Sequence, residues 1–182
     1  MGMETVLFNK DTNRLREIDE LFTGRVRTLP LSGPALEEEI VDADIIIGAI
    51  LVPGGRTPVL ITRPMLGSMK KGSVIVDVSV DQGGCIETSH PTTHDDPVYE
   101  LDGILHYCVA NMPAACARTA TQALTNATLP YVLALAGKGW KTALKADAGL
   151  RRGLNLHLGQ VTHAGLATDL EVPCVSPDIA LE

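Results

Sequence analysis

The chain has 182 residues, a formal net charge of −7, 45% hydrophobic residues and only 3% aromatic residues, which suits one domain or one domain with a small appendage. The acidic balance, without any run of Lys or Arg, argues against nucleic acid or an acidic membrane surface as a partner. No apolar stretch reaches the roughly 18 residues of a transmembrane helix, and no signal-peptide pattern opens the chain, so we expect a cytoplasmic protein. An aliphatic core poor in aromatic residues is typical of a parallel sheet buried on both faces.

The first 80 residues alternate short apolar runs with amphipathic stretches at helical spacing. Strands are predicted at residues 4–8, 25–29, 44–51 and 73–80, and helices at residues 13–22, 34–43 and 62–68. The run at 44–51 is almost entirely apolar, as expected for a central parallel strand. This alternation predicts right-handed βαβ crossovers and therefore an α/β fold with a doubly wound parallel sheet.

The second half of the chain has a different texture. Residues 87–100 are polar and are predicted to form a loop. A fifth strand is predicted at residues 104–110, followed by a long helix over residues 118–135 that breaks near Pro130. The remaining residues suggest short helices packed at one edge of the molecule.

Three of the predicted strands end in residues suited to ligand binding. In open α/β sheets, ligands lie beyond the carboxyl ends of the strands. Asp81 stands at one such end, just before two glycines that permit a close approach of the backbone. We expect the three strand ends to converge on one crevice, and they comprise Ile50 and Leu51; Val78, Ser79, Val80 and Asp81; and Val109, Ala110, Asn111 and Met112.

Long sequence motifs surround these strand ends. DADIIIGAILVPGGRTP precedes the fourth strand, DQGGC and HPTTHDDP follow it, and HYCVANMP and ALTNATLPY come after them in that order. Together they resemble the alanine dehydrogenases over nearly the whole chain. The NAD(H)-binding component of proton-translocating transhydrogenases is the second candidate, because it shares the sheet but is not expected to carry HYCVANMP followed by ALTNATLPY.

The resemblance implies a function as well as a fold. Residues 1–135 are expected to form a Rossmann-like NAD-binding domain, and residues 136–182 a helical segment that packs on a substrate domain. The implied cofactor is NAD, and the implied reaction is the reversible oxidative deamination of L-alanine to pyruvate and ammonia. The implied assembly is a homo-oligomer, a hexamer in the family, or an association with a separate N-terminal half.

One expected motif is missing. A complete dinucleotide-binding unit begins with a strand and G-x-G-x-x-G, whose backbone N–H groups hold the pyrophosphate, and this sequence has no such motif. We therefore expect a fragment that starts after the first strand of the domain. It is expected to be catalytically incomplete, because the family's substrate-binding arginine, its lysine and its catalytic histidine belong to the N-terminal domain.

The resemblance assigns roles at the strand ends. It makes Asp81 the catalytic carboxylate, which can bind an ammonium group or orient the water of imine hydrolysis; from the residues alone, Asp81 can equally cap a turn. Asn111 is expected to bind the carboxamide or the substrate, and Met112 to lie beside the nicotinamide. Their simpler roles are to brace the loop before Pro113 and to pack. The other strand-end residues are expected to contact the cofactor.

Three further residues are predicted at the cofactor. Asn9 takes the place of the acidic residue that holds the ribose hydroxyls in the family; it carries no charge, so NADP is less strongly excluded. Arg14 matches a basic residue near the ribose, or is simply an exposed helix arginine. His90 replaces a common arginine.

No metal site is predicted. The four cysteines show no C-x-x-C spacing, and His90 and His94 are separated by Pro-Thr-Thr, which disfavours a helix that would bring them together. A different class of function also fits the sequence, namely a binding or interaction module without chemistry that docks on a full-length alanine dehydrogenase.

Overall fold

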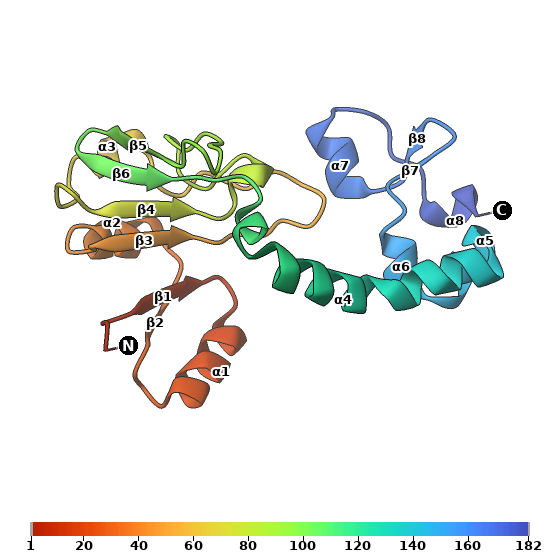
Figure 1. Cartoon of the computed structure of the whole chain (residues 1–182), viewed down its shortest axis with the longest axis horizontal. Coiled ribbons are helices and arrows are strands. Elements are labelled where there is room, and N and C mark those ends of the chain that lie inside the picture. The colour runs from red at the N-terminus through yellow and green to blue at the C-terminus, as the bar shows by residue number, and fades with distance from the viewer. Residues whose placement is uncertain (1, 182) are drawn as a thin grey trace.

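The computed structural model describes residues 2–181 and contains two separate parallel strand groups (Figure 1). In the first, β1 (Val6–Asn9) pairs with β2 (Arg27–Pro30). In the second, the strand order is β3 (Ile45–Gly48), β4 (Val74–Asp77), β6 (Ile104–Tyr107) and β5 (Val98–Leu101), of which only β5 is antiparallel. The predicted α/β fold with a parallel sheet is confirmed.

The crossover helices begin and end where the sequence provides caps. Helix α1 (Thr12–Phe22) starts at Asp11, whose carboxylate accepts from the backbone N–H of Asn13 at 2.9 Å. It ends at Thr23 and Gly24, both with positive φ. The other crossover helices are α2 (Gly33–Ile40) and α3 (Arg63–Leu66).

One face of the four-stranded sheet carries the core. Aliphatic side chains of α2 and α3 pack there against Ile75 and Ile104, and the buried cluster also includes Leu36, Ile40, Ile61, Leu66, Met69, Cys85 and Ile86. The opposite face is open: Ile45 is 54% exposed, Ile47 65% and Leu105 38%. The aliphatic composition predicted burial on both faces, and within residues 2–181 only one face is covered.

The region after residue 84 differs from the prediction in two places. Strand β5 lies partly inside residues 87–100, which were predicted to be a loop. Helix α4 (Ala117–Lys138) runs unbroken through Pro130. None of its residues is buried, and the helix continues on both sides of Pro130 although proline lacks the N–H for one i→i−4 hydrogen bond. The predicted break was wrong.

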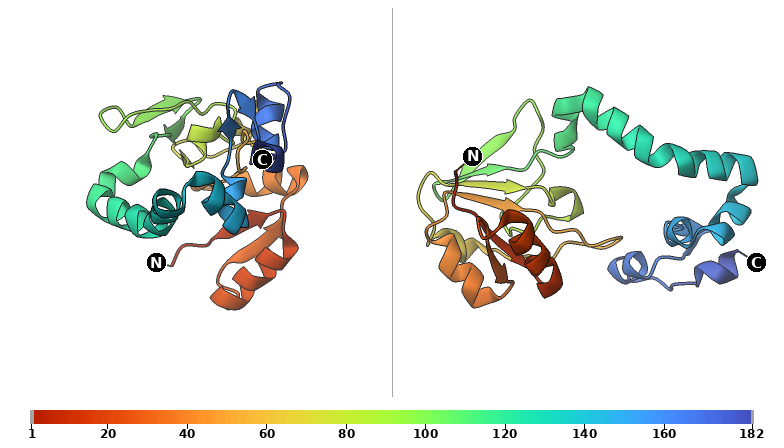
Figure 2. Two further views of the ribbon diagram at one scale, coloured as in Figure 1. Left: turned by 90° about the vertical axis from the view of Figure 1, so that its right-hand side faces the viewer. Right: turned by 90° about the horizontal axis from the view of Figure 1, so that it is seen from below.

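Helix α4 leads away from the sheets to a C-terminal segment of short elements (Figures 1 and 2). That segment contains α5 (Trp140–Ala146), α6 (Ala148–Arg152), the hairpin of β7 (Leu156–His157) and β8 (Gln160–Val161), α7 (Ala164–Asp169) and α8 (Pro177–Ala180). The proposed domain boundary after residue 135 falls inside α4 and stays a prediction. Within the part of the chain that the structure describes, no helix is long and apolar enough to cross a membrane.

Candidate functional site

The carboxyl ends of β3 and β4 border a hollow of about 300 Å³. Because β3, β4 and β6 are parallel neighbours, their carboxyl ends share one edge of the sheet. The hollow is lined by Ala49, Ile50, Leu51, Val78, Ser79, Asp81 and Gln82. The structure thus brings together five of the predicted contacts, Ile50, Leu51, Val78, Ser79 and Asp81, and adds Ala49 and Gln82.

Two polar clamps join the two strand ends. The Ser79 hydroxyl accepts from the backbone N–H of Ile50 at 2.7 Å and donates to the Ile50 carbonyl at 2.8 Å. The Gln82 side-chain oxygen accepts from the backbone N–H of Val52 at 3.3 Å. Ser79 therefore stabilises the crevice wall by joining the ends of β3 and β4, because its hydroxyl already accepts one hydrogen bond and donates another.

Asp81 lies in the short 3₁₀ helix η1 (Val80–Gln82), directly between these clamps. Its side chain is exposed and makes no hydrogen bond or ion pair to another residue of the described range 2–181. The structure thus shows no turn capping by Asp81. Its neighbour Val80 is buried and packs inward, which leaves Asp81 as the carboxylate that faces the hollow.

A second carboxylate, Asp77, lies beneath the same turn. Asp77 is fully buried at the end of β4 and accepts from the backbone N–H groups of Ser79 and Cys85, each at 3.0 Å. Burial, with the charge of Asp77 as the next cause, raises the pKa of the Cys85 thiol to about 12. Sequence reasoning missed Asp77. The available signal was a carboxylate inside an otherwise apolar strand, which needs local hydrogen-bond donors.

The residues after β6 are built differently from those after β3 and β4. Val109 is buried and forms a bridge with Thr92, and the Ala110 backbone N–H donates to the Thr92 carbonyl at 3.2 Å. Asn111 has a positive φ of 57°, and its carbonyl is 3.2 Å from Nε2 of His94. Met112 begins the 3₁₀ helix η2 (Met112–Cys116) and is half-buried. None of Val109, Ala110, Asn111 and Met112 lines the hollow at Asp81.

The three remaining residues predicted to contact the cofactor, Asn9, Arg14 and His90, interact with residues that do not line the crevice. The Asn9 side chain accepts from the backbone N–H of Asp11 at 2.9 Å, which closes the turn after β1. Arg14 forms an exposed ion pair with Glu17 at 2.7 Å. The His90 ring stacks on Tyr99 at 3.9 Å between centroids. Their predicted cofactor contacts stay predictions.

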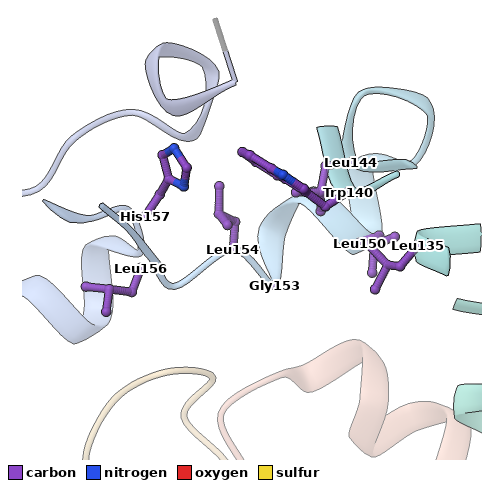
Figure 3. A pocket seen from close by; sticks show the side chains of 8 residues that line it. All are labelled: Leu135, Trp140, Leu144, Leu150, Gly153, Leu154, Leu156 and His157. Atoms are coloured by element: carbon purple, nitrogen blue, oxygen red, sulfur yellow. The ribbon is translucent and has the colours of Figure 1, made fainter. Parts of the chain in front are cut away.

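A larger cavity lies elsewhere, in the C-terminal segment (Figure 3). Its volume is about 490 Å³, and it is lined by Leu135, Trp140, Leu144, Leu150, Gly153, Leu154, Leu156 and His157. The lining is mostly apolar, with five leucines and Trp140, and offers one titratable group, His157. Volume alone therefore does not identify a catalytic site. The smaller crevice at the strand ends is lined by a hydroxyl, a carboxylate and an amide side chain, from Ser79, Asp81 and Gln82. Among residues 2–181, no group of three or more His, Cys, Asp or Glu is placed to hold a metal ion.

A buried histidine supports the wall behind the strand ends. His106 is fully buried in β6, with Nδ1 3.1 Å from the Ile104 carbonyl and Nε2 2.8 Å from the Thr88 hydroxyl. A carbonyl only accepts, so Nδ1 carries the proton and Nε2 accepts from Thr88. Burial lowers the pKa of His106 below its ordinary value of 6.5.

We expect this histidine to make the protein less stable in mild acid. A folded-state pKa below the unfolded one means that the unfolded chain binds more protons as the pH falls below about 6.5. The stabilising effect of neutral His106 is therefore fully present above that pH and is lost below it, by at most about 1.4 kcal/mol per pH unit. Urea unfolding between pH 5 and pH 8 measures this slope. His106→Gln should flatten it, and an unchanged slope in that variant would contradict the assignment.

Comparisons with known proteins agree on one family. A profile of the family described as "Alanine dehydrogenase/PNT, C-terminal domain" matches residues 1–164. An alanine dehydrogenase of Halomonas elongata is 55% identical over 167 residues, which make up 92% of this chain and 45% of that protein. The chain thus spans about half the length of the curated relatives it matches.

Two solved structures resemble this fold to different degrees. An L-alanine dehydrogenase superimposes with a TM-score of 0.79 at 45% identity, covering 93% of this chain and 47% of the other. A transhydrogenase from Sinorhizobium meliloti superimposes with a TM-score of 0.56 at 29% identity, covering 64% of this chain and 32% of the other. The alanine dehydrogenase is the closer of the two in every measure.

Proposed function

The chain belongs to the alanine dehydrogenase/PNT family, and from that premise we propose that it is the nucleotide-binding portion of an NAD-dependent alanine dehydrogenase. The family and the Rossmann-like fold imply a nicotinamide cofactor; the choice of NAD belongs to the proposal. The proposed reaction of the whole enzyme is the reversible oxidative deamination of L-alanine to pyruvate and ammonia. The weaker likeness to the transhydrogenase makes that function the second candidate.

The strand-end crevice fits the nicotinamide end of such a cofactor. Leu51 and Val78 present exposed apolar side chains on its two sides, as a flat aromatic ring requires. Gly48 leaves room for the Cys85 side chain at the end of β3, because a Cβ at that position would collide with the Cys85 sulfur. When bound, the nicotinamide supplies the hydride acceptor. The residues of this chain hold it and present one carboxylate beside it.

The observation that carries the proposal is the exposed, unpaired carboxylate of Asp81 in this crevice. A carboxylate there can hold the substrate ammonium group and orient the attacking water. The crevice lining contains no Arg, Lys or His, so a partner for the substrate carboxylate has to come from outside these residues. In the proposal, that partner and the second acid–base group belong to the substrate domain.

The proposal also includes the affinity for NAD, the preference between NAD and NADP, the cellular location and the oligomeric state. No glycine-rich turn in the sequence is available to hold the pyrophosphate, so we expect the 182-residue chain to bind NAD with a Kd well above about 1 µM. The neutral Asn9 weakens the preference for NAD over NADP. The four cysteines are all free, which agrees with a reducing, cytoplasmic setting. A homo-oligomer completes the proposal.

Asp81→Asn tests the proposed role by a difference between two redox states. A carboxylate next to the ring favours the positively charged NAD⁺ over NADH, so the variant should bind NAD⁺ about fivefold more weakly and NADH at most about twofold more weakly, the range expected for one partly solvated charge pair. Calorimetric titration gives both dissociation constants.

Asp42→Asn is the matched control, since Asp42 is an exposed carboxylate whose only ion pair within residues 2–181 is with Lys70 at 4.0 Å. The control should leave both affinities unchanged. Equal losses for NAD⁺ and NADH in Asp81→Asn, or no loss for either, would place Asp81 outside the nicotinamide site.

A further inference from the structure

The loop after β3 reaches out from the sheet towards α7 in the C-terminal segment (Figures 1 and 2). The middle of this loop, residues 52–57, is called the bridging loop here. Within this loop, the backbone N–H of Arg56 donates to Oδ2 of Asp169 at 2.7 Å, across 113 positions of the sequence. The bridging loop is therefore hydrogen-bonded to the C-terminal segment.

Close glycine packing reinforces the contact. Gly54 has a positive φ of 66°, and a Cβ added there would collide with the ring of His163. A Cβ at Gly165 would come within 3.1 Å of the Gly54 carbonyl oxygen. His163 is itself held, because its Nδ1 accepts from the Leu166 backbone N–H at 3.3 Å. The bridging loop thus lies directly against the His163 ring and the start of α7.

The first and last residues of the bridging loop, Val52 and Thr57, are hydrogen-bonded to the turn that carries Asp81. The Thr57 backbone N–H donates to the Gln82 carbonyl at 2.9 Å, and the Val52 backbone N–H donates to the Gln82 side chain at 3.3 Å. Thr57 is buried although its loop is otherwise mostly exposed. Gln82 follows Asp81 directly in η1. One residue of this turn therefore holds both ends of the bridging loop.

We propose that Asp169 is a positioning residue, which fixes the bridging loop against α7 and through Gln82 holds the Asp81 turn at the crevice. The consequence for the crevice rests on the function proposed above; the mechanical link does not. The Asp169 carboxylate lies at the end of α7 and accepts from the Arg56 backbone N–H, and Val52 and Thr57 in the same loop are hydrogen-bonded to Gln82 at the crevice. Removal of this carboxylate frees the Arg56 backbone N–H. The hydrogen bonds of Val52 and Thr57 to Gln82 then become weaker as well.

Amide hydrogen exchange in the full chain, resolved by residue, tests the link without any ligand. Asp169→Ala should speed exchange at Arg56 directly and at Val52 and Thr57 by about fivefold, the effect of one lost hydrogen bond. Asp169→Asn should restore slow exchange, because its amide oxygen still accepts. Asp178→Ala is the matched control in the same segment, since it breaks only the exposed ion pair with Arg151, and it should leave all three amides unchanged.

Nucleotide titration of the same variants then tests the consequence. Asp169→Ala should weaken NADH binding about fivefold, and Asp169→Asn should restore it. Faster exchange at Arg56 alone, with Val52 and Thr57 unchanged, would overturn the proposal. So would changes as large in Asp178→Ala, or wild-type NADH affinity in Asp169→Ala. If the unsubstituted chain binds no nucleotide, the proposed function fails, while the exchange data still decide the link.

Discussion

Replacing Asp77 with alanine is expected to lower the free energy of unfolding by about 3 kcal/mol, the cost of leaving buried donors without their charged acceptor. The Asp77 carboxylate is fully buried and accepts from the backbone N–H groups of Ser79 and Cys85. In Asp77→Ala these two buried N–H groups lose their acceptor. Urea unfolding monitored by circular dichroism measures the change.

Asp77→Asn and Asp81→Asn make the test specific. The asparagine at position 77 keeps one acceptor oxygen, so we expect a smaller loss than for alanine. Asp81 is exposed and unpaired within residues 2–181, so its substitution should leave stability nearly unchanged. A loss below about 1 kcal/mol for Asp77→Ala, typical of a surface position, would show that Asp77 does not anchor the turn.

The second large effect concerns association. The open sheet face carries exposed apolar side chains on two strands, Ile45 and Ile47 on β3 and Leu105 on β6. Both of these strands pair with β4, which lies between them. In addition, among the strands of the described residues, β1 pairs only with β2, and β3 only with β4. Exposed apolar patches and unpaired strand edges favour association. We expect the 182-residue chain to form large, polydisperse particles in light scattering.

Ile47→Lys places a charge in the middle of the open sheet face and should shift the chain strongly towards monomer. The matched control is Leu21→Lys, because Leu21 is also exposed, at 74%, but lies on α1 away from that face. Thermal unfolding is recorded alongside. An unsubstituted chain that stays monomeric and melts cooperatively at about 45–65 °C would show that the open face is self-sufficient, and would favour an independent binding module.

The sequence predicted the parts of the fold that depend on hydrophobic periodicity. Strands β1 to β4 and β6 were found because apolar runs separate cleanly from amphipathic helices, and parallel order then placed their carboxyl ends together. Strand β5 was missed because its four residues, Val98–Leu101, directly follow a polar stretch rich in Pro, Thr and Asp. Its pairing depends on β6, a neighbour that local patterns do not reveal.

The candidate site was predicted only in part, for a similar reason. Ile50, Leu51, Val78, Ser79 and Asp81 meet because they follow two adjacent strands. Asn111 and Met112 follow β6, where the backbone turns through a positive φ at Asn111 into η2, and such a turn redirects side chains in a way that strand order does not specify. The roles of Asp77 and Gln82 depend on hydrogen bonds that only the folded backbone defines.

The most direct test of the account is to locate nicotinamide dinucleotide on the chain by NMR. Amide shifts of the Ile47→Lys variant, which we expect to be monomeric, are followed during titration with NADH. Binding at the strand ends predicts that the largest changes occur in residues 49–52 and 78–82. Changes confined to the larger cavity around Trp140 and His157, or no changes at all, would contradict the claim that the Asp81 crevice holds the nicotinamide.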